Sequence, residues 1–192
     1  AQEVRVGLYE NEPKIFTAAD GKPAGILVDL LQEIATREGW QLKFVACEWQ
    51  ACLRQLSAGE IDLMPDVAWS EARDQQFDFH QTPALHSWSQ LYTRQNAGIA
   101  APPDLQGKRI AVLQGAVQIN GLNDMMHAFG VRAEVVTLGS MQEVFAVVQN
   151  GSADAAAVNR YSGGIRAHEF GLVESPIVFQ PARLFYATAQ GR

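Results

Sequence analysis

The stretch GILVDLLQEIATREGWQLKFVA, residues 25–46, holds a helix pattern that leads directly into a strand pattern. Apolar side chains recur at helical spacing across residues 26–38, and Gly39 follows the last of them, as is typical of a helix end. Residues 42–46 then form an apolar run of strand length. The stretch therefore predicts one step of an α/β fold.

Neighbouring segments extend this pattern on both sides. Residues 3–9 predict a strand before it, and the apolar stripe from Trp49 to Leu56 predicts a second helix that ends at Gly59. Residues 61–64 predict a third strand. Because parallel strands need long crossover connections, the order β-α-β-α-β predicts a mostly parallel sheet with helices on both faces.

The second half of the chain repeats this order. The tetrapeptides GEID at residues 59–62 and GSAD at residues 151–154 follow the second helix of their respective halves. Two copies favour paired lobes over a solenoid. The segments of the second half are a strand at 108–113, a helix striped by Val117, Leu122, Met125, Met126 and Phe129, a strand at 133–138, a helix capped by Ser140 and Glu143, and a strand at 154–158.

Extended and loop-like runs connect the two halves. Residues 177–179 and 183–188 predict two separate strands, which we expect to return the chain to the first lobe. We expect lobe 1 to hold residues 1–93 and 182–192, and lobe 2 to hold residues 94–181. The crossovers then fall near 93–96 and 178–182. Two crossovers make a hinge, and a cleft between lobes is a common place for a small-molecule site.

Composition narrows the class of protein. A chain of 192 residues that is 47% hydrophobic can build a core that is stable without disulfides or metals. It has 15 Lys and Arg against 21 Asp and Glu, and its basic residues are scattered along the sequence, which argues against a nucleic-acid-binding surface. Apolar runs are far shorter than the roughly 20 residues that cross a bilayer. The chain opens on Ala1 without Met, so we expect a signal or anchor upstream and membrane contact only through segments outside this stretch.

The sequence contains two cysteines, Cys47 and Cys52. We expect them to be free and half-buried, acting as small hydrophobic side chains, and a disulfide between them is the alternative. No metal or cofactor site is predicted, because the histidines have no ligand spacing with each other or with the cysteines. These histidines are His80, His86, His127 and His168.

Ligands of open α/β sheets bind beyond the carboxyl ends of the strands, so the residues after each strand are candidates. Arg73 is the strongest of them for an anion, because a guanidinium holds a carboxylate through two parallel hydrogen bonds. The candidate ligand-binding residues are Tyr9, Glu10, Trp49, Asp66, Ala68, Trp69, Ser70, Arg73, Gly115, Ala116, Val117, Gln118 and Asn159.

Each candidate also has a structural alternative. Arg73 projects from a short helix capped by Ser70, where it could equally pair with a neighbouring carboxylate at the surface. Gly115 could open a helix that binds an anion or make an ordinary tight turn. Trp49 fits core packing as well as ligand stacking, and Asp66 could accept from a ligand amine or cap a turn.

The chain resembles the bacterial extracellular solute-binding proteins, family 3, which have a type II periplasmic binding fold. The resemblance covers almost the whole chain through segments whose order and spacing are specific together. The segments are VRVG at residues 4–7, GILVDL at 25–30, residues 49–62 ending in GEID, SEAR at 70–73 with FDF at 77–79, LQGKRIAVLQG at 105–115, and ADAA at 153–156.

The resemblance implies roles for several residues. Arg73 would clamp a ligand carboxylate, Trp49 would pack on the ligand side chain, and backbone groups at Ala116 would complete the anion site. The family usually has hydroxyl residues at Ala68 and at Ala116 or Val117. It usually has an aspartate that grips the α-ammonium at Asn159, and a neutral amide lacks that charge. Asp66 or Glu10 would have to substitute for it.

The run DLMPDVAWS at residues 62–70, with SWSQ at 87–90 and VNR at 158–160, looks most like the sensor domains of membrane histidine kinases and diguanylate cyclases. We therefore expect a periplasmic sensor domain that closes on a small polar, carboxylate-bearing ligand and forms a homodimer in the full receptor. The alternatives are a transport-linked binding protein for an amino acid and a cyclohexadienyl dehydratase-like enzyme in which Glu10 or Asp66 is the general acid. No catalytic residue is assigned.

Overall fold

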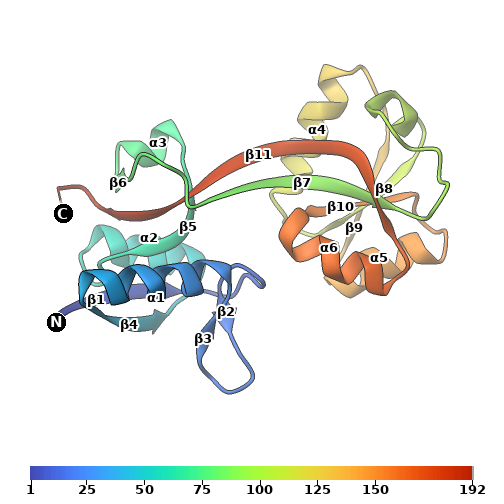
Figure 1. Cartoon of the computed structure of the whole chain (residues 1–192). Coiled ribbons are helices and arrows are strands. Elements are labelled where there is room, and N and C mark those ends of the chain that lie inside the picture. The colour runs from blue at the N-terminus through green and yellow to red at the C-terminus, as the bar shows by residue number, and fades with distance from the viewer. Residues whose placement is uncertain (192) are drawn as a thin grey trace. The chain divides into compact units, whose positions relative to one another are not determined.

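A computed structural model describes residues 1–191 (Figure 1). The chain divides into two compact units. Unit 1 holds Ala1–His86 and the returning end from Ala182, and unit 2 holds Ser87–Pro181. The first division precedes the expected crossover near 93–96, because residues 89–93 pair with a strand of unit 2.

Unit 1 is built on a parallel pair of strands with one helix on each face. Val4 and Val6 pack against the first helix, and an added β-carbon on Gly7 would lie only 2.5 Å from Met64 Sδ and in ordinary contact with Cys52 of the second helix. Its elements are β1 (Gln2–Leu8), β2 (Phe16–Thr17), β3 (Pro23–Ala24), α1 (Ile26–Glu38), β4 (Trp40–Ala46), α2 (Trp49–Ser57), β5 (Met64–Ala68), α3 (Glu71–Asp74) and β6 (Phe77–Phe79).

Unit 2 has a four-stranded core in the order β9-β8-β10-β7, in which β8 is parallel to both neighbours and β7 is antiparallel to β10. Helix α4 covers one face and α5 with α6 the other, because alternate residues of β8 join different cores. Its elements are β7 (Leu85–Thr93), a 3-10 turn (Pro102–Leu105), β8 (Arg109–Leu113), α4 (Gln118–Ala128), β9 (Glu134–Leu138), α5 (Met141–Gln149), β10 (Ala155–Asn159), α6 (Arg160–Glu169) and the first part of β11 (Val173–Ala189).

The internal repeat extends to individual hydrogen bonds. In unit 1 the carboxylate of Asp62 accepts from the backbone N–H of Arg5, and the N–H of Asp62 donates to the carbonyl of Arg5, both at 2.8 Å. In unit 2 Asp154 and Arg109 exchange the same two bonds at the same distance. The final aspartates of the GEID and GSAD tetrapeptides therefore make the same pair of hydrogen bonds to the backbone of an arginine.

Four local expectations are corrected. The third strand is β5, which begins at Met64 rather than at residue 61, because Leu63 makes only an isolated bridge to Val6. Residues 177–179 and 183–188 belong to the one long strand β11, and helix α6 was not anticipated. Gly115 has φ of 74° in a turn, and α4 begins three residues later at Gln118, so Gly115 does not open a helix.

Candidate functional site

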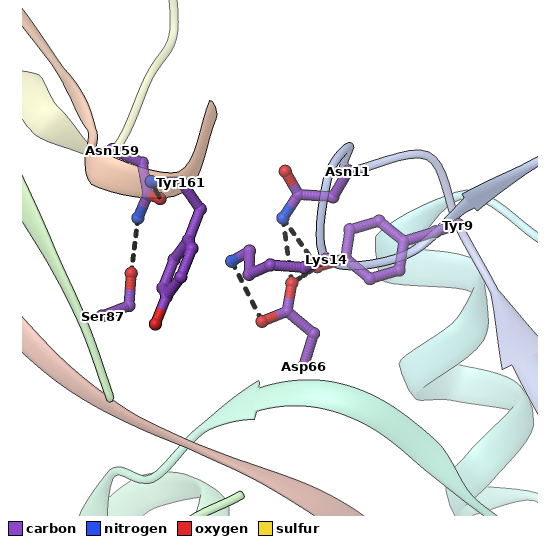
Figure 2. A network of polar contacts seen from close by, with 7 residues as sticks. All are labelled: Tyr9, Asn11, Lys14, Asp66, Ser87, Asn159 and Tyr161. Atoms are coloured by element: carbon purple, nitrogen blue, oxygen red, sulfur yellow. Dashed lines mark hydrogen bonds and ion pairs between the residues drawn. The ribbon is translucent and has the colours of Figure 1, made fainter. Parts of the chain in front are cut away.

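Asp66 is the centre of a buried polar network in unit 1, defined here as Tyr9, Asn11, Lys14 and Asp66 (Figure 2). Its Oδ1 accepts from Lys14 Nζ at 3.0 Å. Its Oδ2 accepts from Asn11 Nδ2 at 2.9 Å and from the hydroxyl of Tyr9. Asp66 is only 5% exposed and lies within β5, not after it, so it neither caps a turn nor projects into solvent.

The loop after β1 brings Lys14 and Asn11 to this carboxylate. Asn11 and Ile15 form an isolated antiparallel bridge, in which the N–H of Asn11 donates to the carbonyl of Ile15 at 2.7 Å. Ile15 is fully buried and anchors the loop in the core. Lys14, next to it, is drawn inward and is 7% exposed.

Tyr9 links the Asp66 network to an aromatic pair. Its ring lies 4.8 Å from the Trp49 ring, centroid to centroid, at an interplanar angle of 50°. Burial, and then the neighbouring Asp66 carboxylate, raise the pKa of Tyr9 well above its usual value. Its hydroxyl therefore stays protonated and acts as a hydrogen-bond donor to Asp66.

Arg73 also lies over the ring of Trp49, with its guanidinium carbon 5.6 Å from the ring centroid. Its Nη1 donates to the carbonyl of Ala68 at 3.0 Å, and its backbone N–H donates to Ser70 Oγ, which caps α3. Partial burial lowers the pKa of Arg73, but a guanidinium stays charged at any physiological pH. Neither carboxylate of α3 pairs with it, so the remaining N–H groups are available to an anion.

Two candidates in unit 1 are used elsewhere. The exposed carboxylate of Glu10 accepts from the backbone N–H of Thr17 at 3.1 Å and holds the start of β2. Trp69 is 42% exposed, and its Nε1 donates to Asp74 at 3.2 Å, while Arg183 lies over its ring. Among the described residues, neither side chain forms a hydrogen bond with the Asp66 network.

Unit 2 presents neutral polar groups at the corresponding strand ends. Asn159 Oδ1 accepts from the N–H of Tyr161 and caps α6, while Asn159 Nδ2 donates to Ser87 Oγ at 2.7 Å (Figure 2). Gln118 Nε2 donates to Ser89 Oγ at 3.3 Å. The Asn159 side chain is therefore a helix cap as well as a candidate ligand contact.

The turn before α4 is open. An added β-carbon on Gly115 would meet nothing within 4 Å, and Val117 is 66% exposed. Ala116 is half-buried against the core, and the carbonyl of Val117 accepts from Gln180 Nε2 at 3.0 Å. This turn is open enough for a ligand to approach its backbone.

Sequence reasoning missed Lys14, Asn11, Ser89 and Gln180. The first two lie in a loop with no strand pattern, although the position of a lysine between Pro13 and Ile15 is a weak signal of burial. Ser89 and Gln180 lie inside long strands, where they gave no signal.

Cys47 and Cys52 form a disulfide, with their Cα atoms 5.4 Å apart, so the preference for two free side chains was wrong. The bond joins the end of β4 to the first turns of α2, which carries Trp49. The pairing was missed because it depends on the tight turn at Glu48, whose carboxylate caps α2.

The part of the chain that the structure describes contains no group of three or more His, Cys, Asp or Glu side chains placed to hold a metal ion. No helix within residues 1–191 is long and apolar enough to span a membrane.

The sequence profile of the bacterial extracellular solute-binding proteins, family 3, matches residues 4–119. The histidine-binding periplasmic protein of Salmonella typhimurium is 30% identical over 159 residues, which are 81% of this chain and 60% of that protein. The virulence sensor protein BvgS of Bordetella bronchiseptica is 26% identical over 94% of this chain and 15% of BvgS. The chain spans about half the length of the first curated relatives that it matches.

The fold agrees with a crystal structure of a histidine kinase sensor domain described as similar to periplasmic binding proteins. The TM-score is 0.72 at 25% identity, over 99% of this chain and 83% of that chain. The expected α/β fold of the type II periplasmic binding proteins is therefore confirmed. Because the profile covers more than half of the sequence, the chain belongs to the bacterial extracellular solute-binding proteins, family 3.

Proposed function

We propose that the chain is the extracytoplasmic sensor domain of a membrane signalling receptor of the histidine kinase or diguanylate cyclase type. It closes on a small polar ligand that carries a carboxylate. Closure can signal only if the ligand binds the closed state more tightly than the open state. The domain is a binding domain and not an enzyme, like the solute-binding proteins of its family.

The observation that carries the proposal is the extent of the likeness to sensors. BvgS aligns over 94% of this chain, whereas the histidine-binding periplasmic protein of Salmonella typhimurium aligns over 81% of it. The disulfide between Cys47 and Cys52 supports a place outside the cytoplasm, because such bonds persist in oxidising compartments. We therefore place the domain in the periplasm.

Arg73 is the proposed anchor for the ligand carboxylate. It is half-buried, its orientation is fixed by Ala68 and by Trp49, and most of its N–H groups have no acceptor among the described residues. Trp49 and Tyr9 supply apolar surface beside it. A fixed fork of donors next to an aromatic face suits a small organic acid.

The second candidate is an amino-acid-binding protein of an ATP-driven importer. It is favoured by the histidine-binding periplasmic protein of Salmonella typhimurium, which matches 81% of this chain. Asn159 argues against it, because a neutral amide that caps α6 and binds Ser87 gives an α-ammonium no charged partner.

Calorimetry on the wild-type protein and on Arg73→Ala, with small carboxylic acids as probes, tests the site. A charge-assisted bidentate pair contributes about 1.5–3 kcal/mol, so we expect the dissociation constant to rise roughly 10- to 150-fold. Arg37→Ala is the matched control, because Arg37 is exposed and pairs with Glu33 on α1. Equal affinity in the Arg73 and Arg37 variants would refute the assignment.

The signalling role is tested in the full-length gene product. A sensor must respond to the same acid with a change in kinase or cyclase output, and Arg73→Ala must shift the dose-response to higher concentration. Ligand-dependent uptake of the acid by cells, without any such output, would favour the importer instead.

A further inference from the structure

We infer that Lys14 and Arg73 together select an organic acid that has no ammonium group, and that Asp66 serves as the internal counter-ion of Lys14 rather than as a partner for a ligand amine. This inference rests on the proposed function and names the class of ligand that unit 1 recognises. The ligand has a carboxylate for Arg73 and a second oxygen acceptor, such as a hydroxyl or keto group, for Lys14.

The ammonium group of Lys14 is buried and has more N–H donors than it has acceptors among the described residues. Its side chain is 9% exposed, and its Nζ has a single acceptor among the described residues, Asp66 Oδ1 at 3.0 Å. An ammonium carries three N–H groups. Buried donors without partners are unfavourable, so the other two require an acceptor from outside the protein.

Both carboxylate oxygens of Asp66, in contrast, already accept hydrogen bonds from the protein. Its side chain is 1% exposed, Oδ1 is held by Lys14, and Oδ2 accepts from both Tyr9 and Asn11 (Figure 2). Three donors already surround the carboxylate and one of them neutralises its charge. The Lys14 cation beside this carboxylate would repel a ligand ammonium.

The two cations belong to one connected cluster. Tyr9 joins them, because its hydroxyl contacts Asp66 while its ring contacts Trp49, over which Arg73 lies. The cluster holds two cations and one carboxylate, which leaves an excess positive charge. The carboxylate of Glu10 does not change this balance inside the cluster, because it is exposed and engaged by Thr17.

A net positive site that lacks an available carboxylate attracts a monoanion and disfavours a zwitterion. An α-amino acid has the carboxylate for Arg73 but adds an ammonium, and the one carboxylate of the Asp66 network is already engaged by three donors. Its α-hydroxy analogue has the same size and replaces the ammonium with an acceptor for Lys14.

Matched pairs of probes test the inference directly. Calorimetry and thermal shift compare alanine with lactate, phenylalanine with 3-phenyllactate, glutamate with 2-hydroxyglutarate, and histidine with imidazole lactate. We expect at least one hydroxy acid to bind, and to bind about tenfold or more tightly than its amino partner. Preference for the amino acids, or binding by no hydroxy acid, overturns the inference.

These outcomes separate the inference from the proposed function. If amino acids bind more tightly and their binding still depends on Arg73, the domain remains a carboxylate sensor and only the selection against ammonium fails. If an acid binds with equal affinity in Arg73→Ala, the proposed anchor itself fails.

Lys14→Met provides a second and sharper test. Methionine keeps the length of the side chain and removes its charge, which leaves the Asp66 carboxylate without a counter-ion. We expect selectivity to move toward the amino member of the bound pair by about tenfold or more, because an ammonium now replaces the one that was lost. An unchanged ratio contradicts the inference.

A double variant guards against loss of folding. Lys14→Met with Asp66→Asn removes both charges, keeps the Tyr9 and Asn11 contacts, and is expected to bind the two members of a pair within about threefold of each other. Retention of the full hydroxy-acid preference would overturn the role of Lys14. Lys22→Met, at an exposed position before β3, is the matched control and should keep the wild-type preference.

Discussion

Asp62 binds Arg5 through both the main chain and the side chain: its Oδ2 accepts from the backbone N–H at 2.8 Å and from Nε at 3.0 Å. The same contact to the backbone N–H joins Asp154 to Arg109 in unit 2. The carboxylate joins the middle of β1 in unit 1, and the start of β8 in unit 2, to the turn that precedes another strand. The two pairs are therefore natural controls for each other.

We expect Asp62→Ala to speed hydrogen exchange at the amide of Arg5 and to leave the amide of Arg109 unchanged. Asp154→Ala should do the reverse, because each substitution removes the acceptor of one amide only. Exchange measured by NMR checks both variants. Equal acceleration at both amides in either variant would contradict the independence of the two contacts.

Gly163→Ala should lower the free energy of unfolding by about 1–3 kcal/mol, because the new β-carbon would lie 2.2 Å from Val158 Cγ2 and α6 would have to move away from β10. Gly164→Ala is the matched control. Its β-carbon would meet only Tyr92 Oη, at 3.7 Å, and removing a helical glycine should raise stability by about 0.5–1 kcal/mol. Urea denaturation measures both, and equal effects of one sign would refute this packing.

Asp104 should make stability fall at acid pH. Hydrogen bonds from the backbone N–H groups of Ala100 and Ala101 lower its pKa below the ordinary value of 3.8. A carboxyl whose folded pKa is lowered contributes stability above its unfolded pKa and loses it as pH falls through the folded pKa. We therefore expect the urea midpoint of the wild type to decline below about pH 4.

Asp104→Asn should reduce this decline, because the amide does not titrate. The comparison with wild type at several pH values between about 3 and 6 isolates the contribution of Asp104 from other groups. A hydrogen bond from a backbone N–H group also lowers the pKa of Glu174, so its contribution to stability is lost in the same direction of pH. Part of the decline should therefore persist in the variant.

Reduction of the bond between Cys47 and Cys52 should lower the free energy of unfolding by about 2 kcal/mol, the value that the chain-entropy model gives for so short a loop. Guanidinium denaturation with and without dithiothreitol measures the loss. The double variant Cys47→Ala with Cys52→Ala should resemble the reduced protein and should not respond to the reductant. A response in that variant would trace the effect to something other than this bond.

The parts of the fold that the sequence predicts well are those with local signals. Helix α1 has the predicted bounds, because its apolar stripe is regular and Gly39 closes it in the left-handed conformation with φ of 71°. Helix α6 was missed for the opposite reason: Gly163 and Gly164 are poor helix formers, and close packing on β10 explains Gly163 alone.

The candidate site could be predicted from the sequence only where a local sequence signal marks it. The short helix that is capped by Ser70 and carries Arg73 was predicted, and the structure contains it, while the role of Arg73 in binding stays a prediction. The Asp66 network could not be predicted, because the burial of Lys14 depends on a carboxylate 52 positions along the chain. Pairing of residues so far apart leaves no periodic trace in a single sequence.

The pair formed by Lys14 and Asp66 also bears on how such domains diversify. The cation lies in a loop and the anion in a buried strand, so a substitution at Lys14 changes the net charge of the Asp66 network without replacing any residue of the sheet. Relatives with nearly superimposable backbones can then respond to chemically opposite nutrients or signals, and a receptor can acquire a new cue by a single codon change.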